Sequence, residues 1–98
     1  MELNFNESEG IVRGTFTGRL DTAAAQVTDI SEFLANADKK IVFDCSKLEF
    51  ISSAGLRLLL ALYKECRAKG GAITLKSVCP SVMRVFKVSA FTNLFSFE

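Results

Sequence analysis

The chain has 98 residues, of which 49% are hydrophobic and 23% charged, and it carries a formal net charge of +1. This length suits one domain with one modest core, and this apolar content argues against disorder. Scattered Lys and Arg with a near-neutral balance indicate neither a nucleic acid nor a membrane surface as partner. With no signal-peptide pattern and no apolar run of membrane-spanning length, we expect a single cytoplasmic domain over residues 1–98.

Three cysteines and the absence of histidine limit the chemistry of this chain. Cys45, Cys66 and Cys79 lack C-x-x-C spacing, which favours free thiols in a reducing compartment. Without histidine, a serine or cysteine nucleophile lacks its usual activating base, and zinc lacks its commonest ligand. No Gly-rich loop with a lysine is present to hold a nucleotide. We therefore expect no enzyme activity, no catalytic residue, no metal and no cofactor.

The first part of the chain predicts a hairpin followed by a helix. Alternating polarity over 3–5 and a second strand-like run over 11–16 predict two strands, with a turn at 6–10 between them. Apolar residues near helical spacing then predict a helix over 23–36, for which Asp21 or Thr22 is the N-cap.

The remainder predicts strands alternating with helices. The continuous apolar run at 41–43 is typical of a central parallel strand covered on both faces. A wide apolar stripe predicts a helix over 54–68 that ends at Gly70. The last predicted elements are a strand over 72–78, a helix over 81–89 and a closing turn with an edge strand over 91–97. The fold class is therefore α/β, with a mixed β-sheet of four to five strands flanked by helices.

The segment between the central strand and the long helix holds the candidate site. Residues 50–56 read Phe-Ile-Ser-Ser-Ala-Gly-Leu, so Ser52 and Ser53 stand at the start of a helix. Unpaired backbone N–H groups and the positive end of the helix dipole favour negative charge at such a position. A serine that accepts a phosphate suits this environment. In the alternative, structural interpretation, Ser53 is only the N-cap of the helix.

Three ordered motifs resemble a known family over nearly the whole chain. They are Gly18-x-Leu20-Asp21 before the first helix, Asp44-x-Ser46 with residues 50–56, and Gly70-Gly71 to Leu75 followed by Pro80-Ser81-Val82 and Phe86. In this order they resemble the STAS domain, the fold of bacterial anti-sigma factor antagonists that also occurs on sulfate transporters.

The resemblance implies a role in bacterial transcription regulation by partner switching. In antagonists of this family, the unphosphorylated protein binds a serine-kinase anti-sigma factor and frees the sigma factor. The kinase phosphorylates a serine or threonine just before the helix glycine, and a dedicated PP2C-type phosphatase reverses the step. The family pattern is roughly Asp-Ser-Ser/Thr-Gly-Leu, which places the acceptor on Ala54, where no hydroxyl exists. Ser53, and after it Ser52, are therefore the candidate phosphoacceptors.

Three further residues are candidates for partner binding. Asp21 matches a family aspartate close to the phosphorylation site, besides serving as a possible N-cap. Gly55 lets the backbone of a partner come close or, alternatively, allows tight helix–strand packing. Arg57, one turn after Ser53, can pair with a phosphate there or simply face solvent. Asp44 is expected to accept hydrogen bonds from the loop that follows its strand.

These observations predict an anti-sigma factor antagonist, a phosphorylation-gated binding module that sequesters a serine-kinase anti-sigma factor as a monomer or weak homodimer. The alternative, which Ala54 favours, is a STAS scaffold subunit of a transport or signalling complex that never carries a phosphate. We also expect Phe95 and Phe97 to leave apolar surface for a partner or a second copy.

Overall fold

Six strands, four α-helices and one short 3₁₀ helix form the computed structural model, which describes all of residues 1–98. The elements are β1 (Glu2–Leu3), β2 (Asn6–Ser8), β3 (Ile11–Leu20), α1 (Thr22–Val27), α2 (Ser31–Ala35), β4 (Lys40–Ile51), α3 (Ser53–Lys69), β5 (Ala72–Lys76), α4 (Pro80–Val88), η1 (Phe91–Asn93) and β6 (Ser96–Phe97). None of the helices combines the length and the apolar character needed to cross a membrane.

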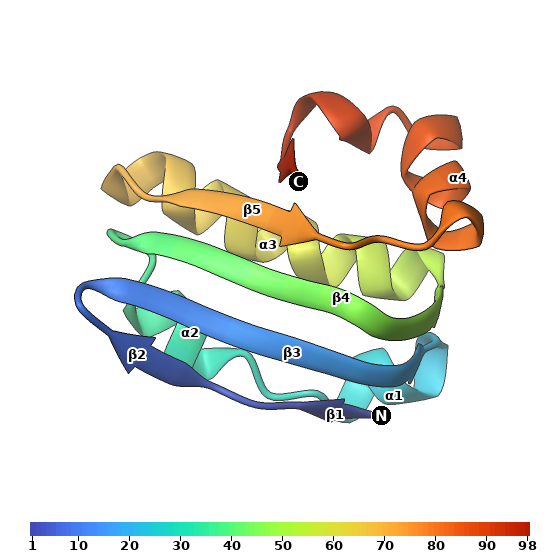
Figure 1. Ribbon diagram of the computed structural model, residues 1–98, viewed down its shortest axis with the longest axis horizontal. Helices are drawn as coiled ribbons and strands as arrows, with labels where there is room; N and C mark the ends of the chain where they lie inside the picture. The colour runs from blue at the N-terminus through green and yellow to red at the C-terminus, as the bar shows by residue number, and fades with distance from the viewer.

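The strands form one mixed sheet in the order β1-β3-β4-β5-β6, with β2 also paired to β3 (Figure 1). Both β1 and β2 run antiparallel to β3, as the predicted hairpin requires, whereas β3, β4, β5 and β6 are mutually parallel. The sheet has six strands rather than four or five because the first arm is interrupted at Asn4, whose Oδ1 accepts the N–H of Thr15 at 2.9 Å. The turn predicted at 6–10 contracts to Glu9 and Gly10, which have φ values of 55° and 78°.

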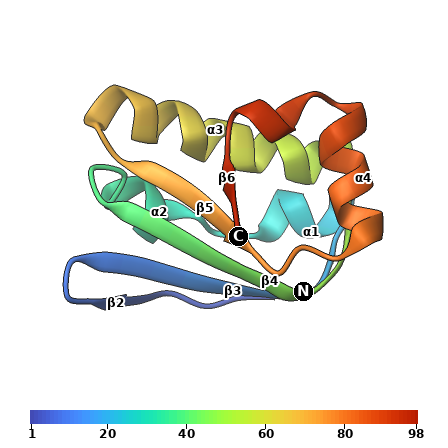
Figure 2. The same cartoon turned by 45° about the horizontal axis from the view of Figure 1, so that its top comes forward.

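The helices α1, α2 and α3 lie on one face of the sheet and leave the other face open (Figure 2). Along β4, Ile41, Phe43 and Cys45 are buried beneath the helices, whereas Asp44 and Ser46 are exposed. The central parallel strand is confirmed, but the prediction that both its faces are covered was wrong. The run at 41–43 is too short to distinguish a fully buried strand from the apolar half of an alternating one.

Two groups of aromatic rings lie within the core. Phe43 contacts Phe16 and Phe33 with ring centroids 4.8 and 5.0 Å apart, and Phe95 lies 5.9 Å from Phe86. Phe95 is only 6% exposed, and Phe97 is half-buried against Phe86. The expectation of an apolar surface at Phe95 and Phe97 was therefore wrong, because η1 and β6 fold these rings onto α4 and α3.

The helix predicted over 23–36 is two short helices, so that prediction was also wrong. Thr28 leaves the helical region with φ −75° and ψ 122°, and its Oγ1 donates to the carbonyl of Ala24 at 2.7 Å. Asp29 then accepts the N–H of Ser31 at 2.9 Å, which begins α2. Such local side-chain bonds compete with helix continuation. The helix predicted over 54–68 is confirmed as α3, and it ends at Gly70, whose φ is 86°.

Candidate functional site

The candidate site lies at the edge of the sheet where β3 and β4 end and α1 and α3 begin (Figure 1). Leu20 and Ile51 are opposite each other in the parallel ladder and are the last residues of their strands. The N–H of Ser52 donates to the carbonyl of Leu20 at 2.9 Å. This pairing holds the first turns of the two helices side by side.

Each of the two helices begins with its own side-chain cap. The carboxylate of Asp21 accepts the N–H of Ala24 at 2.9 Å, so Asp21, not Thr22, is the N-cap of α1. The Oγ atom of Ser52 accepts the N–H of Gly55 at 3.2 Å, so Ser52 is the N-cap of α3. The alternative in which Ser53 serves as the cap was therefore wrong.

Ser53 is exposed in the first turn of α3, and its hydroxyl makes no hydrogen bond. Its side chain lines an open groove of about 350 Å³ between α3 and α4, which we call the Ser53 groove. The groove is lined by Ser53, Leu56, Arg84, Val85, Val88 and Ser89. The structure thus brings an exposed hydroxyl, a guanidinium and an apolar floor together.

Gly55 is buried in the first turn of α3. A Cβ atom at this position would lie 2.9 Å from the Cγ and the carbonyl oxygen of Leu20, and 2.9 Å from Cγ1 of Ile51. The geometry therefore supports the packing alternative for Gly55, because only a residue without a side chain lets α3 approach the end of β3 so closely. Contact between Gly55 and a partner stays a prediction.

Arg57 lies exposed on α3, one turn after Ser53, and it does not line the Ser53 groove. The cation in that groove is Arg84, which was not among the predicted site residues because it lies on another helix far along the chain. Val88, also on α4, is 81% exposed. A signal was present in the sequence: Val82 and Phe86 fill the buried face of α4, which leaves Arg84 and Val88 on its outer face.

The family model of the STAS domain matches residues 2–98. The chain belongs to the STAS domain family. It is 33% identical over 98 residues to a Bordetella bronchiseptica protein named as an anti-sigma factor antagonist, BtrV, with 97% of this chain and 84% of that protein covered. Among solved structures, it resembles one named as an anti-sigma factor antagonist from Thermotoga maritima, with a TM-score of 0.86, 21% identity, and 97% and 84% of the two chains covered. It also resembles the Bacillus cell fate determinant SpoIIAA in its phosphorylated form, with a TM-score of 0.71, 21% identity, and 99% and 91% covered.

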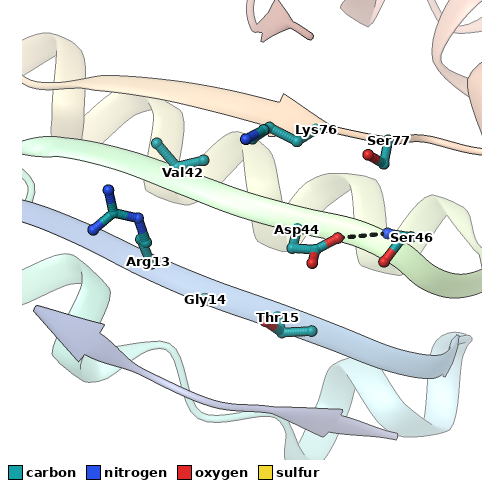
Figure 3. A pocket seen from close by; sticks show the side chains of 8 residues that line it. All are labelled: Arg13, Gly14, Thr15, Val42, Asp44, Ser46, Lys76 and Ser77. Carbon is teal, nitrogen blue, oxygen red and sulfur yellow. Dashed lines mark hydrogen bonds between the residues drawn. The ribbon is translucent and has the colours of Figure 1, made fainter.

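In this STAS domain, the Asp44-x-Ser46 motif lies on the open face of the sheet, not in the Ser53 groove. Asp44 accepts the N–H of Ser46 at 2.9 Å, as expected, and this bond holds the pKa of the carboxyl below its ordinary value. Asp44 was expected at the end of its strand, with its hydrogen bonds coming from the following loop. Instead, β4 continues past a register shift to Ile51, so Asp44 and Ser46 lie in the same strand. Figure 3 shows Asp44 between Thr15 and Lys76. These three residues line a depression of about 310 Å³.

The three thiols of this STAS domain are free and differ in environment. Burial raises the pKa of Cys45 to about 12, and burial also raises the pKa of Cys66. Cys79 is half-buried at the start of α4, where hydrogen bonding to the hydroxyl of Ser81 and the N–H of Val82 lowers the pKa of its thiol. No group of three or more Cys, Asp or Glu side chains is arranged to hold a metal ion.

Proposed function

We propose that this STAS domain is an anti-sigma factor antagonist, a binding module that sequesters a serine-kinase anti-sigma factor. The observation that carries the proposal is the exposed, unbonded Ser53 beside an open groove between α3 and α4. Its similarity to BtrV, at 33% identity across almost the whole chain, supports the same function.

Phosphorylation of Ser53 gates this binding. Ser52 is the weaker candidate because its hydroxyl oxygen is already engaged by the N–H of Gly55. A phosphate on Ser53 would be stabilised locally by the first-turn N–H groups of α3 and by the guanidinium of Arg84. The switch therefore leaves the fold intact. It weakens docking because a close interface would have to desolvate a dianion.

The remaining parts of the cycle follow from this assignment. A PP2C-type phosphatase removes the phosphate from Ser53, and the cycle runs in the cytoplasm. Asp21 lies at the neighbouring helix start and Arg57 lies one turn after Ser53, so both belong to the partner-facing end of the molecule. Neither residue has a catalytic role, since the module binds and is modified by its partner.

A second candidate function rests on Ala54. This position, where the family acceptor falls, carries a methyl group and is half-buried in the first turn of α3. A domain without an acceptor would act as a permanent scaffold in a transport or signalling complex. Purification with a transporter ATPase rather than a kinase would favour this alternative.

The direct experiment is phosphorylation by the candidate kinase with ATP, followed by site mapping by mass spectrometry. We expect one phosphate on Ser53, none on the Ser53→Ala variant, and unchanged labelling of Ser52→Ala. Ser53→Asp should bind the kinase at least about tenfold more weakly than Ser53→Ala. Ser8→Asp, an exposed serine in β2, is the control for added charge and should bind normally. If neither Ser52 nor Ser53 carries a phosphate, or if the two Ser53 variants bind the kinase with equal affinity, gating is refuted.

A further inference from the structure

We propose that the Ser53 groove binds an acidic amphipathic segment of the partner. An aliphatic side chain of that segment inserts between α3 and α4, and the carboxylates of the segment meet Arg84 in the groove and the other exposed cations of the two helices. The identity of the partner rests on the proposed function, whereas the chemistry of the segment follows from the groove itself.

The apolar part of the groove is suited to an aliphatic side chain. Leu56 is 5% exposed, Val85 is half-buried, and Val88 projects with 81% of its surface exposed. The core contacts of α4 are made by Val82 and Phe86, which are 1% and 0% exposed, with the partly buried Met83 and Val85 beside them, whereas Val88 does not pack against the core. Val88 is therefore not needed to hold α4 in place, and covering it would remove apolar surface from water.

The charges on α3 and α4, of which Arg84 lines the groove itself, specify the sign of the partner. Arg57 on α3 and Arg84 and Lys87 on α4 are all exposed, and none of them forms an ion pair. No Asp or Glu occurs within residues 53–64 or 77–97, which include most of α3 and all of α4. The whole chain has a net charge of only +1, so this positive area is a local feature. A partner with carboxylates complements it, whereas a basic partner would be repelled.

The same contacts explain how phosphorylation would compete with docking. A phosphate on Ser53 lies in the groove with Arg84 and would pair with it from within the chain. The incoming carboxylate would lose its guanidinium and would meet a dianion instead. The phosphate also occupies part of a groove of only about 350 Å³. The charge of the phosphate and its volume therefore both oppose docking of the partner.

Direct titration with a designed peptide tests the groove without the natural partner. The probe is a helical peptide with leucines on one face and glutamates flanking them, and the matched control carries lysines in place of the glutamates. Amide chemical shifts in ¹⁵N-labelled protein should move around Ser53, Arg84 and Val88 with the acidic peptide and stay unchanged with the basic one. Shifts confined to other surfaces, equal effects of both peptides, or groove shifts that depend only on protein concentration would overturn the proposal.

Variants of the full chain then test the same contacts against the serine-kinase anti-sigma factor. Arg84→Glu and Val88→Asp should each weaken binding by about tenfold or more, whereas Arg84→Lys should retain most of it. Arg13→Glu makes the same charge change on the open face of the sheet and should bind as the unmodified chain does. Both α4 positions are exposed, and thermal unfolding would verify that the variants fold.

The outcomes separate this inference from the proposed function. If Ser53→Asp abolishes binding but Arg84→Glu and Val88→Asp do not weaken it, the groove assignment is wrong and the antagonist function stands. If the acidic peptide binds the groove but the kinase does not bind the chain, the antagonist function fails and the groove assignment stands.

Discussion

The Oγ atom of Ser52 accepts the N–H of Gly55 at 3.2 Å, so Ser52 has a different role from the adjacent Ser53. Ser52 satisfies a first-turn donor that would otherwise have no partner inside the helix. Ser53 makes no such bond and faces the groove shared with Arg84. The structural and regulatory interpretations of the serine pair therefore apply to different residues and can be tested independently.

Removing each hydroxyl in turn should give different stabilities. Ser52→Ala should lower the free energy of unfolding by about 1 kcal/mol, because it removes the cap of the longest helix. Ser53→Ala should change the free energy of unfolding by less than about 0.5 kcal/mol, because the hydroxyl that it removes is exposed and makes no hydrogen bond. Urea denaturation of both variants measures the difference. If Ser53→Ala lowers the free energy of unfolding as much as Ser52→Ala does, the assignment of Ser52 as the cap is contradicted.

Gly55→Ala should destabilise the domain although alanine is normally the better helix former. The added methyl would lie 2.9 Å from the carbonyl oxygen of Leu20, which is fixed by its bond to the N–H of Ser52. We expect a loss of about 1–3 kcal/mol from overpacking, despite the gain of about 1 kcal/mol in helix propensity. Ala61→Gly at an exposed position of α3 measures the effect of the difference in helix propensity alone. A Gly55→Ala variant that unfolds at higher urea than the unmodified chain would refute the close packing.

The parts of the fold that depend on local signals could be predicted from the sequence. The apolar stripe and Gly70 located α3 within one residue at each end, and the helix predicted over 81–89 matches α4 within one residue at each end. The lengths of β3 and β4 were underestimated, whereas that of β5 was overestimated by two residues. The strand β4 continues through Asp44, Ser46 and Lys47, which are polar residues on an open face next to a bulge. A polar residue in a strand with one solvated face gives the same pattern as a residue in a loop.

The candidate site was only half predictable for a related reason. The serine pair and Asp21 stand at helix starts that local residues define, so the sequence located them. The pairing of Leu20 with Ile51, which places those helix starts together, is a long-range contact. Arg84 belongs to the site only because α4 lies across the groove from the first turn of α3. Nothing in the sequence around Ser53 indicates that neighbour.

The three thiols should react at different rates with iodoacetamide. Cys79 should be modified first near neutral pH, because it is half-buried and its lowered pKa increases the fraction of reactive thiolate. Cys45 should react only in the unfolded chain, because it is 1% exposed and burial raises its pKa to about 12. Timed alkylation followed by peptide mass spectrometry measures the order. Ser81→Ala removes one bond to the Cys79 sulfur and should slow its alkylation. Modification of Cys45 before Cys79 in folded protein would contradict the burial of Cys45 and the lowered pKa of Cys79.

Asp44 should make a stabilising contribution that is lost in acid. The N–H of Ser46 favours the charged carboxylate, and Lys47 and Lys76 add smaller attractions, so the folded pKa lies below the unfolded one. Its stabilisation is therefore complete above the unfolded value of about 4, and it disappears as the pH falls through the folded pKa. Asp44→Asn keeps an oxygen acceptor for Ser46 but removes the charge. This variant should be less stable than the unmodified chain at neutral pH, and the two unfolding curves should converge in acid. A difference in the free energy of unfolding that persists undiminished well below pH 4 would show that the lost contribution is not electrostatic.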